Sequence, residues 1–296
     1  MLQISVISGK GGTGKTSITA ALSALAGSAV LADCDVDAAD LHIILDPDVQ
    51  RAEEFSGGNT ARIQKSKCTQ CGACRELCRF DAIGGSLVID PVSCEGCGVC
   101  AAFCPEKAIT MAPKLSGHWF VSDTRNGPMV HARLGIAEDN SGKLVSRVRQ
   151  EAKKLAEIKS LDCVIVDGPP GIGCPVIAAI TGVDLVLVVT EPTLSGLHDL
   201  ERVLETARHF NIPAAVCVNK FDINPQNTAA IEELCAKQSI PVVARIPYDR
   251  GVVRALMQKQ TVFEHEGCTA AAREIKTMWD SVAVLLDNPT AVRSVQ

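Results

Sequence analysis

Short apolar runs bounded by turn residues alternate with helical patterns through most of the chain. The runs are rich in Val and Ile and mostly lack an inward and outward alternation, which is typical of parallel strands buried on both faces. Strands are predicted at residues 3–8, 28–33, 162–167, 184–190, 214–219 and 242–246. Helices are predicted at residues 15–26, 144–159, 196–210, 227–238, 251–258 and near 269–286. This alternation predicts an α/β fold built on a doubly wound, mostly parallel sheet.

The alternation breaks between residues 62 and 113, where eight of the fourteen cysteines gather. The spacing Cys-x2-Cys-x2-Cys-x3-Cys begins at Cys68 and again at Cys94, which is 26 residues further along the chain. We interpret this internal repeat as an inserted α+β domain at 62–113, which divides the α/β domain into residues 1–61 and 114–296. Residues 56–59 are predicted to form the linker into the insert, and the chain is predicted to leave it near Pro113.

The composition of the chain excludes several classes of protein. Its 296 residues are 47% hydrophobic and 3% aromatic, which predicts a large aliphatic core and excludes a disordered chain. The net charge of −5 argues against broad attraction to nucleic acid or anionic lipid. The N-terminus lacks a signal-peptide pattern, and no apolar run reaches the roughly 18 residues of a membrane helix. We therefore expect a cytoplasmic protein, without membrane or nucleic-acid partners, whose thiols are reduced or bind metal.

Residues 9–16 read Gly-Lys-Gly-Gly-Thr-Gly-Lys-Thr between the first predicted strand and helix, which is the context of a phosphate-binding loop. The glycines allow backbone N–H groups to face phosphate oxygens at the positive end of the helix. The Lys15 ammonium would neutralise the β- and γ-phosphates, and the Thr16 hydroxyl would ligate Mg²⁺. The predicted nucleotide-binding residues of this loop are Gly9, Lys10, Gly11, Gly12, Thr13, Gly14, Lys15, Thr16 and Ser17.

Acidic residues follow two of the predicted strands. Asp167 ends an apolar strand, as does an aspartate that holds Mg²⁺ or its water ligand in a nucleotide site. Asp35 lies in a cluster of aspartates after the second strand, and we assign it to the Mg²⁺ site as the carboxylate that orients the attacking water. Gly171, in the loop after Asp167, would sense the γ-phosphate through its amide. The alternative is that these carboxylates only cap the turns or helices that follow.

The loop sequence, Asp35 and the Asp-Gly-Pro-Pro-Gly segment at 167–171 resemble the deviant Walker A ATPases, which include MinD, ParA, Mrp-type carriers and the nitrogenase iron protein. The resemblance implies Mg²⁺-dependent ATP hydrolysis by a dimer that sandwiches ATP, formed by two copies of this chain or with a paralogous ATPase. It implies that Lys10 crosses this interface and acts in catalysis with Lys15, Asp35 and Asp167. The residues that it places beside adenine are Asn219, Lys220, Pro247 and Asp249, although an Asn at a strand end is also a simple turn former.

The cysteine segment resembles the bacterial two-cluster ferredoxin. In that pattern three cysteines at x2 spacings bind one [4Fe–4S] cluster, and the fourth binds the other cluster. Arg79 follows Cys78 where the pattern has Pro, and a cation beside a cluster would raise its potential. Structural zinc and [3Fe–4S] clusters are the alternatives. The two predicted sets of ligands are Cys68, Cys71, Cys74 and Cys104 for one cluster, and Cys78, Cys94, Cys97 and Cys100 for the other.

Residues 62–80 carry five basic side chains against one acidic side chain, Glu76. They would dock an acidic redox partner, or they form a solvated face. The basic residues are Arg62, Lys65, Lys67, Arg75 and Arg79. We expect the six scattered cysteines to be ordinary thiols, buried by default at 163 and 174. They are Cys34, Cys163, Cys174, Cys217, Cys235 and Cys268.

These features favour an ATPase whose nucleotide state gates electron transfer between two [4Fe–4S] clusters and a partner protein. The insert follows the Asp35 segment directly, so that a phosphate-dependent shift there could reach it. One alternative is an iron–sulfur carrier or assembly ATPase of the Mrp type, which would hand a labile cluster to an acceptor. Another is a spatial-organisation ATPase like MinD or ParA. The C-terminal tail has one basic residue and a proline, which disfavours MinD-like membrane binding.

Overall fold

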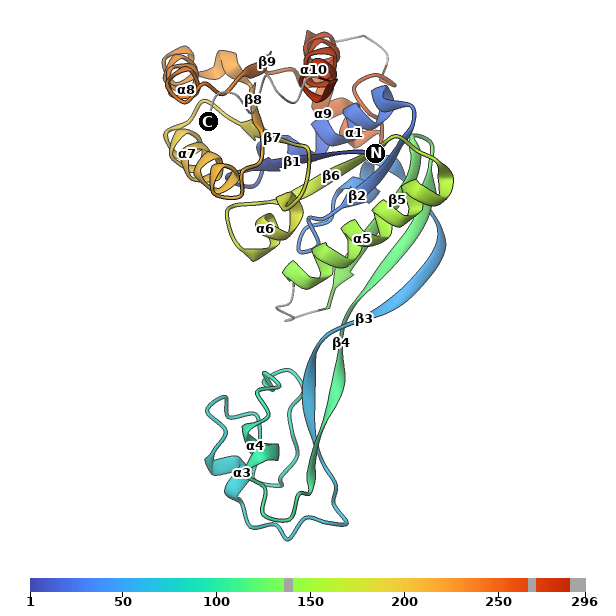
Figure 1. Cartoon of the computed structure of the whole chain (residues 1–296), viewed down its shortest axis with the longest axis vertical. Coiled ribbons are helices and arrows are strands. Elements are labelled where there is room, and N and C mark those ends of the chain that lie inside the picture. Colours follow the sequence, from blue (N-terminus) through green and yellow to red (C-terminus); the bar gives the residue numbers. More distant parts are fainter. Residues whose placement is uncertain (136–140, 266–269, 288–296) are drawn as a thin grey trace. The chain divides into compact units, whose positions relative to one another are not determined.

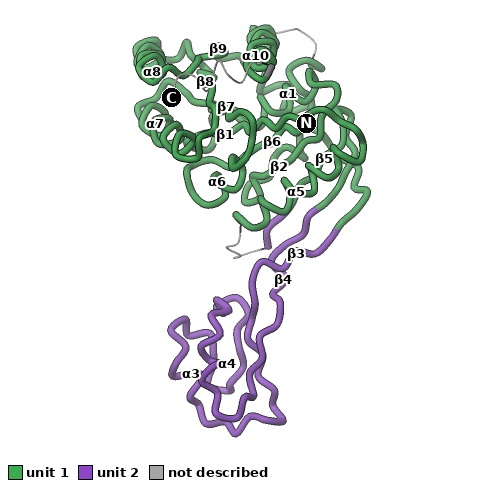
Figure 2. Tube along the Cα trace, viewed as in Figure 1, with its two compact units in different colours: residues 1–52, 120–132, 141–296 green, residues 53–119, 133–140 purple. Residues whose placement is uncertain are grey.

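The computed structural model describes residues 1–135, 141–265 and 270–287. The chain forms two compact units, the first from residues 1–52, 120–132 and 141–296 and the second from residues 53–119 and 133–140 (Figure 2). All eight clustered cysteines belong to the second unit. The predicted helix start near residue 269, Cys268 and the tail from residue 288 lie outside the described residues.

The first unit contains the predicted parallel sheet (Figure 1). Neighbouring strands follow the order β3-β4-β5-β2-β6-β1-β7-β8-β9. From β5 to β9 in this order, all neighbouring strands are parallel. The six strands that the sequence predicts are β1 (Leu2–Ser8), β2 (Ala29–Asp33), β6 (Cys163–Pro170), β7 (Leu185–Thr190), β8 (Ala214–Asn219) and β9 (Val242–Ile246). The expectation of a mostly parallel sheet is confirmed.

Helices cover both faces of this sheet, because successive strand residues point to opposite sides. On one face, α1, α2 and α10 pack against residues such as Ile4 and Leu187. On the other face, α6, α7 and α8 pack against Ile7, Val186 and Val188. The helices are α1 (Lys15–Ala26), α2 (Leu41–Leu45), α5 (Ser141–Lys159), α6 (Cys174–Ile180), α7 (Leu194–His209), α8 (Pro225–Lys237), α9 (Arg250–Met257) and α10 (Ala270–Asp287), with a 3-10 turn η1 (Phe221–Ile223).

Besides the six strands predicted above, the sheet contains β3 (Asp48–Ile63), β4 (Ile109–Thr124) and β5 (Gly127–Leu134). Most of the side chains in the first half of β3 are exposed and polar, so that this strand carries no apolar pattern. The predicted linker at 56–59 is wrong, because these residues lie inside β3. The predicted exit near Pro113 is likewise wrong, because Pro113 lies inside β4. Both strands are continuous from one unit into the other.

An arginine in the turn between β4 and β5 joins three segments of the first unit. The Arg125 guanidinium donates hydrogen bonds to the backbone oxygens of Ile44 and Lys259, at 2.9 Å and 2.8 Å. It also forms an ion pair with Glu264, whose carboxylate accepts a further hydrogen bond of 2.7 Å from the Thr261 amide. Hydrogen bonds from Arg125 and Thr261 lower the pKa of Glu264 from its ordinary value of 4.5 to about 2.

The second unit repeats one backbone conformation twice, in step with its sequence repeat. Its short helices α3 (Ala73–Glu76) and α4 (Val99–Ala102) occupy equivalent positions in the two halves. Equivalent hydrogen bonds of 2.8 Å run from the Gln64 amide to the Ala108 oxygen and from the Asp90 amide to the Ala82 oxygen. Equivalent pairs also share a positive φ, and these pairs are Gln70 and Gly96, Gly72 and Gly98, and Asp81 and Lys107. The sequence repeat therefore corresponds to a structural repeat. No helix in the described part of the chain is long and apolar enough to cross a membrane.

Candidate functional site

The loop between β1 and α1 has the conformation of a phosphate-binding loop. Gly12 and Gly14 have φ angles of 80° and 89°, which L side chains rarely adopt. A Cβ atom at Gly14 would also lie 2.4 Å from the Asn219 Nδ2 atom. Glycine is therefore required at position 14, both by its backbone and by the close approach of Asn219. Helix α1 begins at Lys15, so that its N-terminus follows the loop directly.

A buried cluster of charges lies behind this loop. The Lys15 Nζ atom is 3.1 Å from Asp167 Oδ1 and 3.3 Å from Asp35 Oδ2. The Thr19 hydroxyl donates a hydrogen bond of 2.9 Å to the same oxygen of Asp167. Asp33 and Asp167 are adjacent in the register of β2 and β6, and both are fully buried. Lys15, Asp35 and Asp167, which the sequence separates by up to 152 positions, thus meet at one point.

The cluster holds three carboxyl groups beside one ammonium group. Burial and the charge of Asp167 raise the pKa of Asp33 well above its ordinary value. Burial also raises the pKa of Asp35, although Lys15 opposes this shift. Burial would lower the pKa of Lys15, but Asp167 and Asp35 outweigh it, and the net shift is upward. Within the described residues, one oxygen of Asp33 and one of Asp167 are buried without a hydrogen-bond partner. These orphaned oxygens, with the hydroxyl of Thr16 nearby, are hard donors that suit Mg²⁺.

A pocket of about 410 Å³ adjoins the loop. Asn219 and Lys220 line it, and the Asn219 side chain donates a hydrogen bond of 2.7 Å to the Thr13 oxygen. The two other predicted adenine-side residues, Pro247 and Asp249, are not among its lining residues. Asp249 instead caps α9, because its carboxylate accepts a hydrogen bond of 2.7 Å from the Gly251 amide.

The sequence analysis did not identify the apolar wall of this pocket. The wall comes from α9, α10 and the segments beside them. Its residues are Ile246, Val252, Val253, Leu256, Val262 and Ile275. The amphipathic pattern of residues 251–258 was visible as a helix, but nothing in the pattern distinguishes a side chain in a ligand pocket from one in the core. An apolar wall opposite a phosphate-binding loop is suited to a flat nucleotide base.

Lys10 and Gly171 make contacts within the chain itself. The Lys10 Nζ atom donates to Thr193 Oγ1 at 3.0 Å and to Ser195 Oγ at 3.2 Å, and it lies 3.6 Å from Glu191 Oε2. Glu191 also forms an ion pair with Lys220, which lines the pocket. The Gly171 amide donates a hydrogen bond of 2.8 Å to the Ser8 oxygen. Both groups thus have hydrogen-bond partners within the chain.

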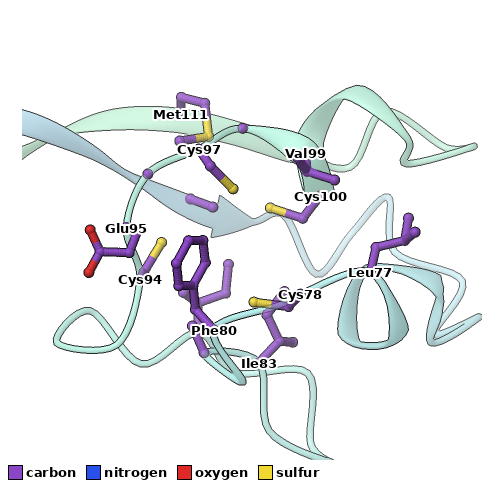
Figure 3. A pocket seen from close by; sticks show the side chains of 15 residues that line it. Leu77, Cys78, Phe80, Ile83, Cys94, Glu95, Cys97, Val99, Cys100 and Met111 are labelled. Atoms are coloured by element: carbon purple, nitrogen blue, oxygen red, sulfur yellow. The ribbon is translucent and has the colours of Figure 1, made fainter.

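The eight clustered cysteines line two pockets in the second unit, four to each. One pocket is lined by Cys78, Cys94, Cys97 and Cys100, and Figure 3 shows their sulfur atoms turned toward a shared centre. The other is lined by Cys68, Cys71, Cys74 and Cys104. In each pocket three cysteines come from one repeat and the fourth comes from the other repeat. The remaining lining residues are mostly apolar, including Phe80 and Met111 in the first pocket.

Backbone amides approach the cysteine sulfurs. The Ala108 amide donates to Cys104 Sγ at 3.3 Å. Burial alone would raise the pKa of Cys94, but hydrogen bonds from the Ala61 and Gly96 amides and from Thr60 lower it. Such donors favour the thiolate form, which is the form that binds metal. Among the described residues, no group of three or more His, Cys, Asp or Glu side chains is arranged to hold a single metal ion.

Most of the scattered cysteines are inert. Burial raises the pKa values of Cys34 and Cys217, raises that of Cys163 to about 12 and raises that of Cys235 to about 11. The expectation that Cys174 is buried is wrong, because this residue begins α6 at the surface and is exposed.

The fold is similar to those of solved MinD structures. The septum site-determining protein MinD of Pyrococcus horikoshii, solved with Mg-ADP, has a TM-score of 0.58 and 18% identity, and the match covers 96% of each chain. At this identity the likeness shows the fold alone.

Two curated relatives from Methanocaldococcus jannaschii match much of the chain. Uncharacterized protein MJ0578 is 36% identical over 230 residues, which are 77% of this chain and 81% of that protein. Uncharacterized protein MJ0579 is 26% identical over 280 residues, which are 93% of this chain and 96% of that protein. The family model of the CobQ/CobB/MinD/ParA nucleotide binding domain matches residues 4–262. The chain belongs to the CobQ/CobB/MinD/ParA family of nucleotide-binding domains.

Proposed function

We propose that this protein is an ATPase of the MinD/ParA type that couples its nucleotide state to electron transfer through two [4Fe–4S] clusters. The nucleotide-binding family assignment supports the first half of this proposal. The observation that carries the second half is the division of eight cysteines into two pockets of four, in the interleaved sets that a two-cluster ferredoxin pattern requires. The combination favours a redox module attached to a nucleotide switch.

Residues of the phosphate-binding loop and the aspartates behind it would have different roles in ATP hydrolysis. Lys15 would bind the β- and γ-phosphates, and Thr16 would ligate Mg²⁺ together with Asp167 or its water. Phosphate oxygens would then compete with Asp35 and Asp167 for the Lys15 ammonium, which now lies 3.3 Å and 3.1 Å from them. Asp35 would be released to orient the attacking water. ATP binding therefore changes the partners of Asp35, which makes this residue the natural start of a switch.

Dimer formation would complete the site. Lys10 now binds Thr193, Ser195 and Glu191 of its own chain. Its side chain is 30% exposed, so that it can leave these partners for the phosphates of a nucleotide in a second subunit. The partner would be a second copy of this chain or a paralogous ATPase.

The two cysteine pockets would hold the clusters. Cys68, Cys71, Cys74 and Cys104 would ligate one cluster, and Cys78, Cys94, Cys97 and Cys100 the other. A single zinc ion would need its ligand sulfurs at about 2.3 Å from one point, whereas four thiols around a pocket suit a larger cluster. When bound, each cluster supplies one-electron redox chemistry. The apolar lining would limit the access of water, and the Ala108 amide would donate a hydrogen bond to the Cys104 sulfur.

A covalent route connects the two activities. Strands β3 and β4 contain residues of both units, and β3 follows the Asp35 segment and α2 in sequence. A change of partners at Asp35 could therefore be passed along the backbone to the second unit. The proposed role of this segment is to make electron transfer depend on the nucleotide.

Matched cysteine substitutions test the cluster assignment. Protein prepared anaerobically should contain about eight irons and eight sulfides per chain, because each [4Fe–4S] cluster has four of each. Cys78→Ala should impair the cluster of Cys94, Cys97 and Cys100, although Cys78 lies in the first repeat, and Cys104→Ala should impair the other cluster. Electron paramagnetic resonance would show which signal each variant loses. Zinc without sulfide, or loss of the same signal in both variants, would contradict the proposal.

A further inference from the structure

The two halves of the second unit share a backbone conformation but carry opposite charge. Residues 62–87 contain five basic and two acidic side chains, whereas residues 88–113 contain one basic and three acidic side chains. For each basic residue of the first half, the equivalent residue 26 positions later in the sequence is uncharged. The pairs are Arg62 and Val88, Lys65 and Pro91, Lys67 and Ser93, Arg75 and Ala101, and Arg79 and Pro105. Because the backbone repeats, this asymmetry is not required by the fold.

Residues 75–80 combine this positive charge with exposed apolar side chains. The side chains of Leu77 and Phe80 are 45% and 37% exposed, and both also line the pocket that contains Cys78 (Figure 3). Arg75 and Arg79 are exposed, and the Arg79 guanidinium carbon lies 5.4 Å from the centroid of the Phe80 ring. The segment therefore presents two apolar side chains that line a cysteine pocket, together with the exposed charges of Arg75, Glu76 and Arg79.

The equivalent segment of the other half lacks this combination. Phe103, the counterpart of Leu77, is 68% exposed. Its neighbours at the matched positions are Ala101, Pro105 and Glu106, so that no cation flanks the apolar side chain. Exposed apolar surface thus occurs on both halves, but at the matched positions it is accompanied by arginine only in residues 75–80. Charge complementarity would therefore direct an acidic partner protein to the first half of the unit rather than to the second half.

We propose that residues 75–80 form the docking surface for a small electron-carrier protein whose own docking face is acidic. The proposal rests on the proposed function, because the carrier would exchange electrons with the cluster held by Cys78, Cys94, Cys97 and Cys100. One electron passes between that cluster and the carrier, so that one is oxidised and the other is reduced by one electron, and no bond forms or breaks. Redox encounters use small interfaces, below about 1,200 Å², in which charge accelerates and orients association.

Charge reversal in the full-length protein tests this surface, with flavodoxin, an acidic flavin-containing electron carrier, as the probe. The dissociation constant is measured by calorimetry at low and at physiological salt for Arg75→Glu, Arg79→Glu and Lys107→Glu. Lys107 is exposed and lies in the other half, so that its reversal changes the net charge equally at a different place. We expect each arginine variant to weaken binding about fivefold or more at low salt, with a smaller effect at high salt because salt screens surface charge. Lys107→Glu should weaken binding less than twofold.

Two results would overturn the docking proposal: no binding of flavodoxin by the unsubstituted protein, or equal losses in the arginine variants and Lys107→Glu. Iron and sulfide are counted on the same preparations. If clusters are present and the arginine variants bind normally, the docking surface is wrong and the proposed function stands. If clusters are absent and the arginine variants alone lose binding, the surface stands and the proposed function is wrong.

Discussion

Replacement of Lys15 by methionine tests whether the P-loop lysine also balances charge in the absence of nucleotide. The ammonium is 6% exposed and is paired with Asp35 and Asp167, while Asp33 adds a third carboxyl group to the same cluster. Removal of one partner from a buried ion pair typically costs about 3–5 kcal/mol. We expect the lower end, about 3 kcal/mol at pH 7, because burial and the charge of Asp167 raise the pKa of Asp33, so that this carboxyl group takes up a proton more readily than an exposed one.

The pH dependence has a defined sign. Burial raises the folded-state pKa values of Asp33 and Asp35 above the ordinary value of 3.8, and the loss of Lys15 removes a charge that lowers both. A carboxyl group with a raised pKa binds its proton more tightly in the folded state, so that stability falls as pH rises through the interval between the two values. The deficit of Lys15→Met relative to the unsubstituted protein should therefore be smaller at pH 5 than at pH 8.

Urea unfolding, followed by circular dichroism in the presence of a chelator and without nucleotide, measures the effect. Lys237→Met is the control, because Lys237 and Glu233 form an exposed pair on α8 whose loss should change the stability little. Addition of Asp167→Asn to Lys15→Met should recover at least about 1 kcal/mol, since it removes an uncompensated charge. The reasoning fails if Lys15→Met is as stable as Lys237→Met, or if the second substitution adds to the loss.

Three further predictions concern the first unit. Gly14→Ala places a Cβ atom 2.4 Å from Asn219 Nδ2 at a φ of 89°, so that it should abolish nucleotide binding measured by fluorescence, whereas Ser17→Ala should reduce it less. Glu191→Gln removes the carboxylate that pairs with Lys10 and Lys220. We expect this substitution to tighten ATP binding about threefold to tenfold, because ATP binding no longer has to break roughly 1 kcal/mol of partly exposed ion pairing. Unchanged or weaker ATP binding would contradict this prediction. Glu264→Gln should destabilise the protein most above pH 4.5. The loss of stability should shrink as pH falls toward about 2, because the contacts that lower the pKa of Glu264 stabilise only its ionised form. A loss of stability that does not depend on pH would refute this prediction.

The elements buried on both faces were predictable from sequence. The strands β1, β7 and β8 are continuous Val- and Ile-rich runs, and their boundaries were predicted within a residue. Strand β3 was not predicted, because most of its first half faces solvent and its residues lack an apolar pattern. The contact of Lys10 with Thr193 could not be predicted either, because it depends on two loops that are 183 positions apart in the sequence.

The candidate site likewise contains some features that the sequence predicted and some that it did not. The loop at 9–16 and the cysteine repeat are local patterns, so that the sequence was sufficient to predict the glycine-rich turn and the grouping of the cysteines in two sets of four. Pro247 and Asp249 were inferred from resemblance alone, and the structure places neither among the residues that line the pocket. The apolar wall of α9 and α10 becomes visible only when the helices are placed opposite the loop.

Control of electron transfer by the nucleotide state can be measured directly. Reduction of the clusters by a partner or chemical donor is timed, and their midpoint potentials are determined, in the presence of Mg-ADP and of a non-hydrolysable ATP analogue. We expect the analogue to change the rate, the potential or both, and Lys10→Ala to remove the difference because it prevents dimer closure. Identical rates and potentials in the two nucleotide states would contradict the claim, and rapid transfer of iron and sulfide to an acceptor protein would favour a cluster carrier instead.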